Sequence, residues 1–469
     1  MDPERTKRRQ SIKIIVSEAL MVLTVAVTVV ILAFLVSGYW INSNFEVERQ
    51  GLLQVSSMPT GADVYIDGDS SWLQRTNTSK VLTSGEHTVK LTKEGYDSWS
   101  KTITISEGLL YRLHYPRLFL QQGATESVLS AGKAIFGTVS PDRSKLLLAM
   151  PSSSWQLVGL DSEEIKPSSI AVSSLLATGE SGESITLSPD AIVSAHWDRD
   201  SSHVLVELRI QDTTEWLLLD VNSPDKSINL GKEFGSNFVN VQILDDSANT
   251  LLALTSGNLR KIDVSGRVIS APIAENVADY DHYNSSEVVF SAKSTTSNDT
   301  LEYYVGYAKL SDGKVSRVLS TASPAKVAIS RFYDDKYITI VQGSHVALYS
   351  KDDFALLSEY ELSFTPATVE VGHNGEFITM SLGDHIATLD MEIQNIREWT
   401  TGSSTVGWLD SDMVYAVVDG ELVVYDFDGL NRRVLAQGVS AQFPATVSAN
   451  DRWLYYVHGD TLMRKVISD

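Results

Sequence analysis

A degenerate repeat runs through residues 119–469 and sets the strongest limit on the fold. Each unit has a turn rich in Asp, Asn or Ser, then an apolar strand, then a second strand that ends near an Asp. One unit cannot bury both faces of its strands, so neighbouring units must stack on one another. We count eight units, whose opening turns begin at Ser140, Trp197, Leu244, Tyr283, Tyr333, His373, Leu409 and Ser448.

Stacked units of this kind favour a ring of four-stranded β-sheets. Asp, Asn and Ser side chains bond to their own backbone and hold tight turns, and a closed ring leaves only short sheet edges. The array resembles β-propellers of the WD40 and TolB-like kind in pattern only, because no Gly-His…Trp-Asp signature recurs. We expect a propeller over residues 119–469 with eight blades, and seven as the alternative.

The last unit offers only three strands, expected at residues 439–447, 453–458 and 461–467. A short strand-like segment at Glu126–Leu129 precedes the first unit and has no role within it. We expect residues 119–130 to supply the missing strand by pairing with 462–467. One blade would then be built from both ends of the repeat, and an exposed edge would be removed.

A second β-rich module is expected over residues 44–118. Val89 and Leu91 share one face of a strand, and Ile103 and Ile105 do so in the next, which is the period of a half-buried strand. Turn-forming pairs, with Gly as the second residue, separate these strands. Several short strands in so few residues predict a small antiparallel β-sandwich.

Two segments of this module, SMPTGADVYIDG and SGEHTVKLTKEGY, resemble the PEGA domain. The resemblance implies a β-sandwich found in surface proteins, with no established catalysis. After the Asp-Gly turn the sequence departs from the family's usual Gly-x-Thr-Pro segment, and Trp72 lies in this departure. Gly61 and Gly95 are expected at turn positions with positive φ. The matching positions are Pro59, Gly61, Ala62, Asp67, Gly68, Gly85, His87, Lys93, Gly95 and Tyr96.

Three aromatic residues of this module, Trp72, Tyr96 and Trp99, are candidates for a sugar-stacking, ligand-binding platform. The alternative is that Tyr96 and Trp99 pack the edge of the sandwich. Both explanations use the large apolar faces of these rings, and the sequence leaves both open.

An apolar run at Ala19–Val36 holds only two threonines as polar residues and no charge, Pro or Gly. As a helix it would span roughly 27 Å, about the thickness of a bilayer's hydrocarbon core. The first 13 residues of the chain carry five basic and two acidic side chains, and Tyr39 and Trp40 follow the run. This asymmetry predicts an uncleaved transmembrane signal-anchor within residues 1–43, with the N-terminus cytoplasmic. A cleaved signal peptide is the rival interpretation.

Composition narrows the function further. The chain has no Cys and a net charge of −21, which makes it a poor surface for nucleic acid. No catalytic motif is found, so no catalytic, cofactor-binding or metal-binding residue and no cofactor is expected. The expected function is a membrane-anchored, extracytoplasmic cell-surface scaffold or binding protein. Its propeller would bind a protein or a cell-wall glycan.

Two other functions stay open. One is a propeller enzyme (a hydrolase, a lyase or a quinone-dependent dehydrogenase) with its site in the central channel. Acidic and His side chains converging on the channel-lining strands would favour it, and an apolar, sealed channel would favour the scaffold. The other is an assembly factor that works through a partner protein.

Overall fold

The computed structural model describes residues 3–36, 39–41, 47–152, 154–172, 174–176, 186–210, 213–244, 247–295, 301–311, 313–372 and 374–468. The chain divides into two compact units, Met1–Gln122 and Gly123–Asp469. Strands are the main regular structure of both units, as the alternating and repeated sequence patterns predict.

The first unit begins with one long helix, α1 (Pro3–Val36). The two threonines of its apolar run bond within the helix, because Thr24 Oγ1 donates to Leu20 O and Thr28 Oγ1 to Thr24 O, both at 2.8 Å. The side chains described are those of Val16 and residues 18–33. Among them, no stretch is both long and apolar enough to qualify as a membrane span. The expected transmembrane helix therefore stays a prediction from the sequence.

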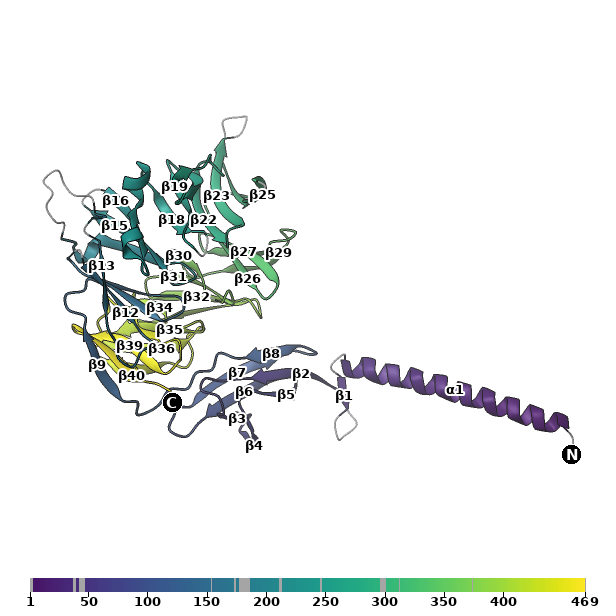
Figure 1. The fold of residues 1–469 in the computed structure, drawn as a ribbon. Coiled ribbons are helices and arrows are strands. Elements are labelled where there is room, and N and C mark those ends of the chain that lie inside the picture. The colour runs from purple at the N-terminus through teal and green to yellow at the C-terminus, as the bar shows by residue number, and fades with distance from the viewer. Residues whose placement is uncertain are drawn as a thin grey trace. The chain divides into compact units, whose positions relative to one another are not determined.

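Two four-stranded sheets form the rest of the first unit (Figure 1). In one sheet, β2 (Val47–Val55) pairs with β5 (Thr78–Thr83) on one side, and with β1 (Tyr39–Ile41) and β8 (Leu110–Leu113) on the other. The other sheet has the order β4 (Asp69–Arg75), β3 (Asp63–Ile66), β6 (Gly85–Thr92), β7 (Trp99–Ile105).

Alternate residues of these strands fill a common core. Leu53 of β2 and the predicted inward residues Val89, Leu91, Ile103 and Ile105 are all buried. The residues between them on β6 and β7 are mostly exposed, so the period-two pattern reports the two faces of each sheet correctly. The predicted small β-sandwich is confirmed.

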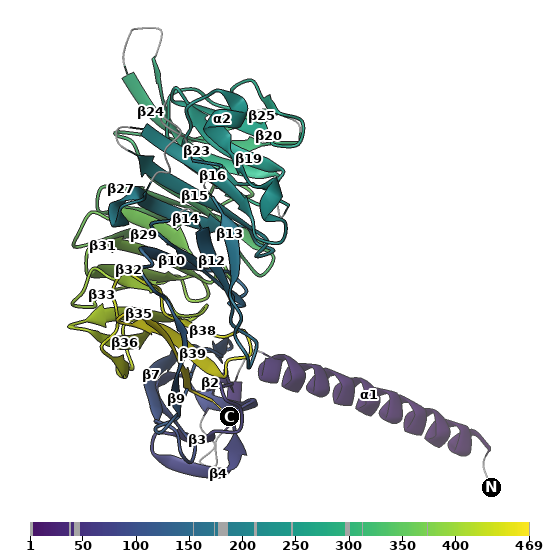
Figure 2. The ribbon, with the colours of Figure 1, turned by 60° about the vertical axis from the view of Figure 1, so that its left-hand side comes forward.

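The second unit consists of eight consecutive four-stranded antiparallel sheets in its described residues, which is the arrangement of propeller blades (Figures 1 and 2). In chain order the first four blades are β10 (Phe136–Val139), β11 (Lys145–Ala149), β12 (Ser154–Gly159), β13 (Ser168–Ala171); β14 (Ile192–Trp197), β15 (His203–Ile210), β16 (Thr213–Asp220), β17 (Ile228–Asn229); β18 (Val239–Ile243), β19 (Thr250–Thr255), β20 (Asn258–Asp263), β21 (Val268–Ile269); and β22 (Val277–Tyr283), β23 (Glu287–Thr295), β24 (Leu301–Lys309), β25 (Lys314–Thr321).

The other four blades continue the series. They are β26 (Lys326–Phe332), β27 (Asp335–Gln342), β28 (His345–Ser350), β29 (Leu356–Glu361); β30 (Thr368–Val371), β31 (Phe377–Leu382), β32 (His385–Asp390), β33 (Asn395–Thr400); β34 (Val406–Trp408), β35 (Met413–Val418), β36 (Glu421–Asp426), β37 (Arg433–Gln437); and β38 (Thr446–Val447), β39 (Trp453–His458), β40 (Thr461–Val466) with β9 (Thr125–Ser130). A short helix, α2 (Leu230–Phe234), follows β17.

Polar side chains fix the turns between the first and second strands, as the repeat predicts. Asp198 Oδ1 accepts the backbone N–H groups of Ser202 and His203, at 2.7 and 2.9 Å. Asp198 Oδ2 also lies 2.7 Å from His203 Nδ1, so this His is part of a turn. Ser448 Oγ accepts the N–H of Trp453 at 3.0 Å in the last blade. These bonds satisfy backbone donors that the sharp turn leaves without a strand partner.

The eighth blade closes the ring in the way predicted from the sequence. β9 pairs antiparallel with β40, with Leu129 opposite Leu462 and Glu126 opposite Arg464 (Figure 1). Arg464 Nε donates to Glu126 Oε1 at 2.7 Å, and its Nη1 donates to Ser162 O of the first blade at 3.1 Å. Tyr455 Oη also donates to Leu160 O at 2.7 Å. The eighth blade is thus bonded to the first without a covalent link.

Candidate binding site in the propeller channel

The first strands of five blades line one cavity of about 850 Å³. Its walls come from β14, β18, β22, β26 and β30, with Glu207 of β15 and Trp216 of β16 added. Because the first strands of five different blades face this one space, we assign the cavity to the central channel of the ring. Successive residues of a strand point to opposite sides, so each strand places only alternate side chains in the channel.

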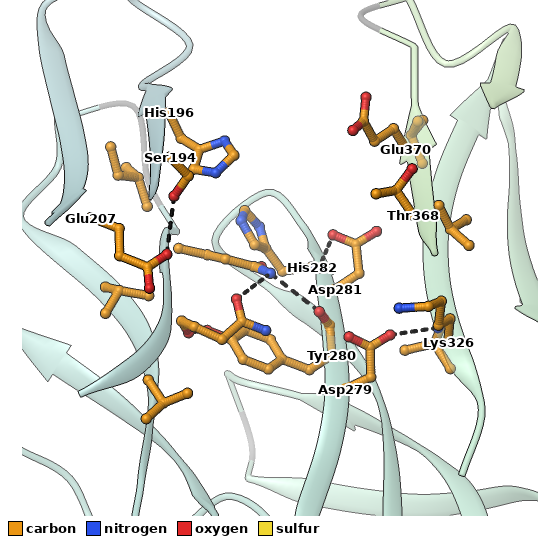
Figure 3. A pocket seen from close by; sticks show the side chains of 18 of the residues that line it. Ser194, His196, Glu207, Asp279, Tyr280, Asp281, His282, Lys326, Thr368 and Glu370 are labelled. Carbon is orange, nitrogen blue, oxygen red and sulfur yellow. Dashed lines mark hydrogen bonds between the residues drawn. The ribbon is translucent and has the colours of Figure 1, made fainter. Parts of the chain in front are cut away.

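Two titratable side chains reach the channel from different blades. His196 of β14 and Glu370 of β30 are both exposed to it, and Figure 3 shows them on opposite sides. Neither side chain has a hydrogen-bond partner among the described residues. The surrounding walls exclude water and so disfavour the charged carboxylate, which raises the pKa of Glu370. The same effect lowers the pKa of the His196 imidazole, although the charge of Glu207 opposes it.

Asp279 and Asp281 of β22 lie on the channel wall and bond to the next blade. The N–H of Val327 donates to Asp279 Oδ2 at 2.8 Å, and the N–H of Ile329 donates to Asp281 Oδ2 at 2.9 Å. Burial raises the pKa of both carboxyls, while these bonds act in the opposite direction. The two Asp residues therefore have a structural role, since they satisfy donors on the inner edge of β26.

Polar groups of β18 and β22 join the third and fourth blades. Tyr280 Oη donates to Leu252 O at 3.0 Å and also to Asn240 O, and Gln242 Nε2 donates to Tyr280 O at 3.2 Å (Figure 3). Gln242 Oε1 and the indole N–H of Trp197 are buried in the channel wall, and the described residues offer them no partner. One acceptor and one donor are thus left for a bound molecule or for water.

The channel therefore presents a mixed set of hydrogen-bonding groups. Carboxylates, imidazoles, amides and hydroxyls are joined by a single ammonium group, that of Lys326 (Figure 3). No three described carboxylate or imidazole ligand atoms of residues 123–469 lie within 4.8 Å of one another, so they do not assemble a metal centre as arranged. A concave site where polar groups of several elements converge is a usual setting for a small-molecule ligand.

The aromatic residues proposed for sugar stacking lie elsewhere. Trp99 is fully buried and Tyr96 is 8% exposed, so both rings pack in the sandwich and cannot stack on a ligand. The Trp99 ring meets the Tyr115 ring edge-on, with centroids 6.1 Å apart. This corrects the stacking hypothesis for these two residues in favour of the packing alternative. The side chain of Trp72 lies outside the described residues.

The PEGA motif positions have the structural roles that the resemblance implies. Gly61 and Gly95 have φ of +79° and +81°, as predicted, and Gly68 has +82°. Asp67, with φ of +54°, completes the Asp-Gly turn. Ala62 is buried in the core, and the backbone carbonyl of Pro59 accepts a hydrogen bond from Ser57 Oγ at 2.7 Å.

Local sequence does not single out the channel residues as a site. His196 directly precedes a turn of the repeat, where a structural role is the simpler interpretation, and no motif marks Asp279 or Glu370. One signal was present: polar residues alternate along Asp279–Tyr283, as on a strand with one face towards solvent. That pattern gives no indication that five strands converge on the same space.

Comparison with known protein families identifies the first module. The family model described as PEGA domain matches residues 50–117, which confirms the resemblance of the first module. No curated protein sequence matches the chain.

Solved structures similar to the chain include β-propellers. The C-terminal WD40 domain of Sif2 aligns with 10% identity and a TM-score of 0.47, covering 74% of this chain and 98% of that domain. The Dos1 propeller aligns with 13% identity and a TM-score of 0.45, covering 73% and 93%. An oligogalacturonate lyase from Vibrio parahaemolyticus aligns with 11% identity and a TM-score of 0.41, covering 60% and 92%. Similarities this low say nothing about the ligand.

Proposed function

We propose that this protein is a membrane-anchored, extracytoplasmic binding protein whose propeller channel holds a glycan. The observation that carries the proposal is the 850 Å³ channel with polar side chains from five blades. Each hydroxyl of a sugar both donates and accepts hydrogen bonds, so a sugar suits a wall that mixes carboxylates, imidazoles and amides. The volume lies within the range of about 300–1,000 Å³ that is usual for ligand sites.

The binding site is tested by substituting two side chains that form no hydrogen bond with the described residues, so that neither substitution breaks such a bond within the protein. The full chain is screened against an array of cell-wall and capsular oligosaccharides, and the strongest glycan is titrated by calorimetry. Glu370→Gln and His196→Ala should each weaken its binding about tenfold, the usual effect of losing a hydrogen bond to a charged or polar group. Glu164→Gln, at a surface carboxylate paired with Lys166, is the matched control. Unchanged affinity in both channel variants would refute the channel site.

The enzyme alternative is favoured by one observation. His196 and Glu370 face the same space from two blades and bond to no described residue, as acid–base groups in a free enzyme often do. Mass spectrometry of a glycan incubated with the full chain separates the two functions. A binding protein leaves the glycan intact over hours, whereas cleavage that both channel variants abolish identifies a hydrolase or a lyase.

The membrane anchor is supported by the sequence and by the helix. The uncharged run Ala19–Val36 follows a basic segment, and the large apolar residues described in α1 are 48–66% exposed. A run of this length suits a bilayer core, and the basic flank places the N-terminus inside. Protease added to intact cells should remove everything after about Trp40 and spare an N-terminal tag. A mature protein that starts near Gly38 would instead indicate a cleaved signal peptide.

A further inference from the structure

A row of apolar side chains crosses the outer face of the β5–β2–β8 sheet. Leu52 of β2 lies between Val81 of β5 and Leu110 of β8. These three side chains are 37%, 56% and 36% exposed, and the adjacent Leu109 is 63% exposed. The next residue along β2, Leu53, points the other way and is fully buried. We call these four exposed residues the apolar row.

Among the outward positions of β2, β5 and β8 whose side chains the structure describes, no carboxylate surrounds the apolar row, although the chain beyond its first 13 residues carries a net charge of −24. The outward positions of the opposite sheet include charged residues, because β6 places Glu86 and Lys90 there. On the face with the apolar row, the outward residues whose side chains the structure describes are Gln50, Leu52, Gln54, Ser79, Val81, Thr83, Leu110 and Arg112.

The register places the apolar row near the end of α1. β1 and β8 pair with the same side of β2, where Tyr39 is opposite Arg49 and Leu110 is opposite Leu52, about 10 Å further along. The N–H of Leu52 donates to Leu109 O at 2.9 Å, so β8 occupies the edge of β2 at this position. α1 ends three residues before Tyr39. The apolar row therefore lies within about 20 Å of the helix end.

We propose that this face of the first module rests on the outer surface of the bilayer that holds α1, with the apolar row in the headgroup layer. The proposal rests on the membrane anchor proposed above. Four side chains are too few for a stable protein interface, which buries about 800 Å² per partner. The first module is joined to α1 by only a few residues, so the effective concentration of lipid at this face is high. Even a weak contact with the membrane would therefore be occupied most of the time.

Single labels test the contact, because the chain has no Cys to remove. Val81→Cys and Leu109→Cys place a fluorophore in the apolar row, and Thr102→Cys places one on the exposed face of β7. Each full-length variant is reconstituted in vesicles of phosphatidylcholine and phosphatidylglycerol at 3:1. Lipids with a nitroxide near the headgroup should quench the labels at 81 and 109 at least twofold more than the label at 102. Iodide in solution should quench them less.

A label in α1 separates this proposal from the anchor. Val29→Cys should be quenched by lipids with a nitroxide near the bilayer centre. If it is quenched and the label at 81 behaves like that at 102, the docking proposal is wrong and the anchor stands. If the label at 29 is not quenched, the anchor itself fails. The labels at 81 and 109 could also be shielded from iodide and yet not be quenched by the nitroxide lipids. That result would indicate a protein or a second copy of this chain on the face, and it would also overturn the proposal.

Discussion

Both ring nitrogens of His87 face acceptors in the first module. Nδ1 lies 2.7 Å from Asp67 Oδ2, and Nε2 lies 2.8 Å from Thr83 O. A neutral imidazole carries one N–H, so only the protonated ring donates to both. Burial by itself would lower the pKa of His87, but these two bonds outweigh it and raise the pKa. The bond to His87 is the largest cause that lowers the pKa of Asp67.

This pair predicts a pH window for the stability of the Asp67 turn. A raised His pKa stabilises the fold below the unfolded value of 6.5, and this contribution is lost as the pH rises through the folded pKa. A lowered Asp pKa stabilises the fold above 3.8, and this is lost as the pH falls. The effect should be about 1 kcal/mol or less, since the pair is partly exposed.

Hydrogen exchange of the β6 peptide measures this effect. In the wild-type protein, intrinsic-rate-corrected protection should be higher at pH 5.5 than at pH 8.5. His87→Gln should remove that difference, while the peptide of β7 stays unchanged. A β6 peptide with the same pH dependence in both proteins would show that His87 does not carry it.

Backbone conformation makes a second prediction at the residue scale. Gly61→Ala and Gly95→Ala should each destabilise the first module by about 1 kcal/mol, because both positions have φ near +80°, where Ala is strained. An added Cβ would meet no atom within 4 Å at either position, so the effect would report backbone strain and not a clash. Gly159 is the control, since it also has open space around it and its φ is not positive. Calorimetry of the full chain should show a lower first-module transition for the two turn variants and no shift for Gly159→Ala.

At the scale of elements, Glu287 joins the fourth and fifth blades. Its carboxylate lies at the start of β23, accepts the Tyr307 hydroxyl at 2.6 Å, contacts Lys336, and lies 3.0 Å from Lys351 Nζ. Burial by itself would raise the pKa of Glu287, but these three partners hold it at about 2. Its contribution to stability is present above the unfolded value of 4.5 and is lost as the pH falls towards 2.

Removing this charge should therefore destabilise the propeller in a pH-dependent way. Glu287→Gln removes the buried charge that two half-buried ammonium groups share, those of Lys336 and Lys351, and should cost about 3 kcal/mol at pH 7. The difference from the wild-type protein should shrink at pH 3, as urea unfolding of the full chain can show. Glu302→Gln, at a more exposed pair with Arg317, should cost no more than about 0.5 kcal/mol. Equal effects of the two substitutions would contradict the assigned role of Glu287.

Strands and turns were the part of this fold that local sequence could predict. β39 has the predicted bounds, and the pairing of Glu126–Leu129 with the last strand was expected from one unused segment. These features depend on alternation and turn chemistry over fewer than ten residues. The channel depends on distant segments: His196 and Glu370 meet the same cavity only because their two blades, with three others between them, belong to one ring. No short pattern marks a residue as facing the axis rather than a neighbouring blade.

Ring closure makes a prediction for the whole molecule. Arg464 is almost fully buried and bonds Glu126, Ser162 O and Glu163 O, so it joins the outer strand of the eighth blade to the first blade. Arg464→Ala should lower the propeller's unfolding free energy by about 2 kcal/mol or more. β9 should show the largest gain in hydrogen exchange. Arg317→Ala is the matched control. If the protection of β9 is unchanged in Arg464→Ala, the contacts of Arg464 with Glu126 and the first blade do not hold the ring closed.

The pairing of β9 with β40 also orders the assembly of the protein in time. Glu126 and Arg464 are 338 positions apart, which corresponds to roughly 20–70 s of synthesis at common elongation rates. During that interval β9 has no partner strand, and seven blades form beside an open gap. The propeller thus becomes resistant to proteolysis only after its last strand has been made. A chain that stops before Thr461 would remain an unclosed arc that quality-control proteases can recognise and remove.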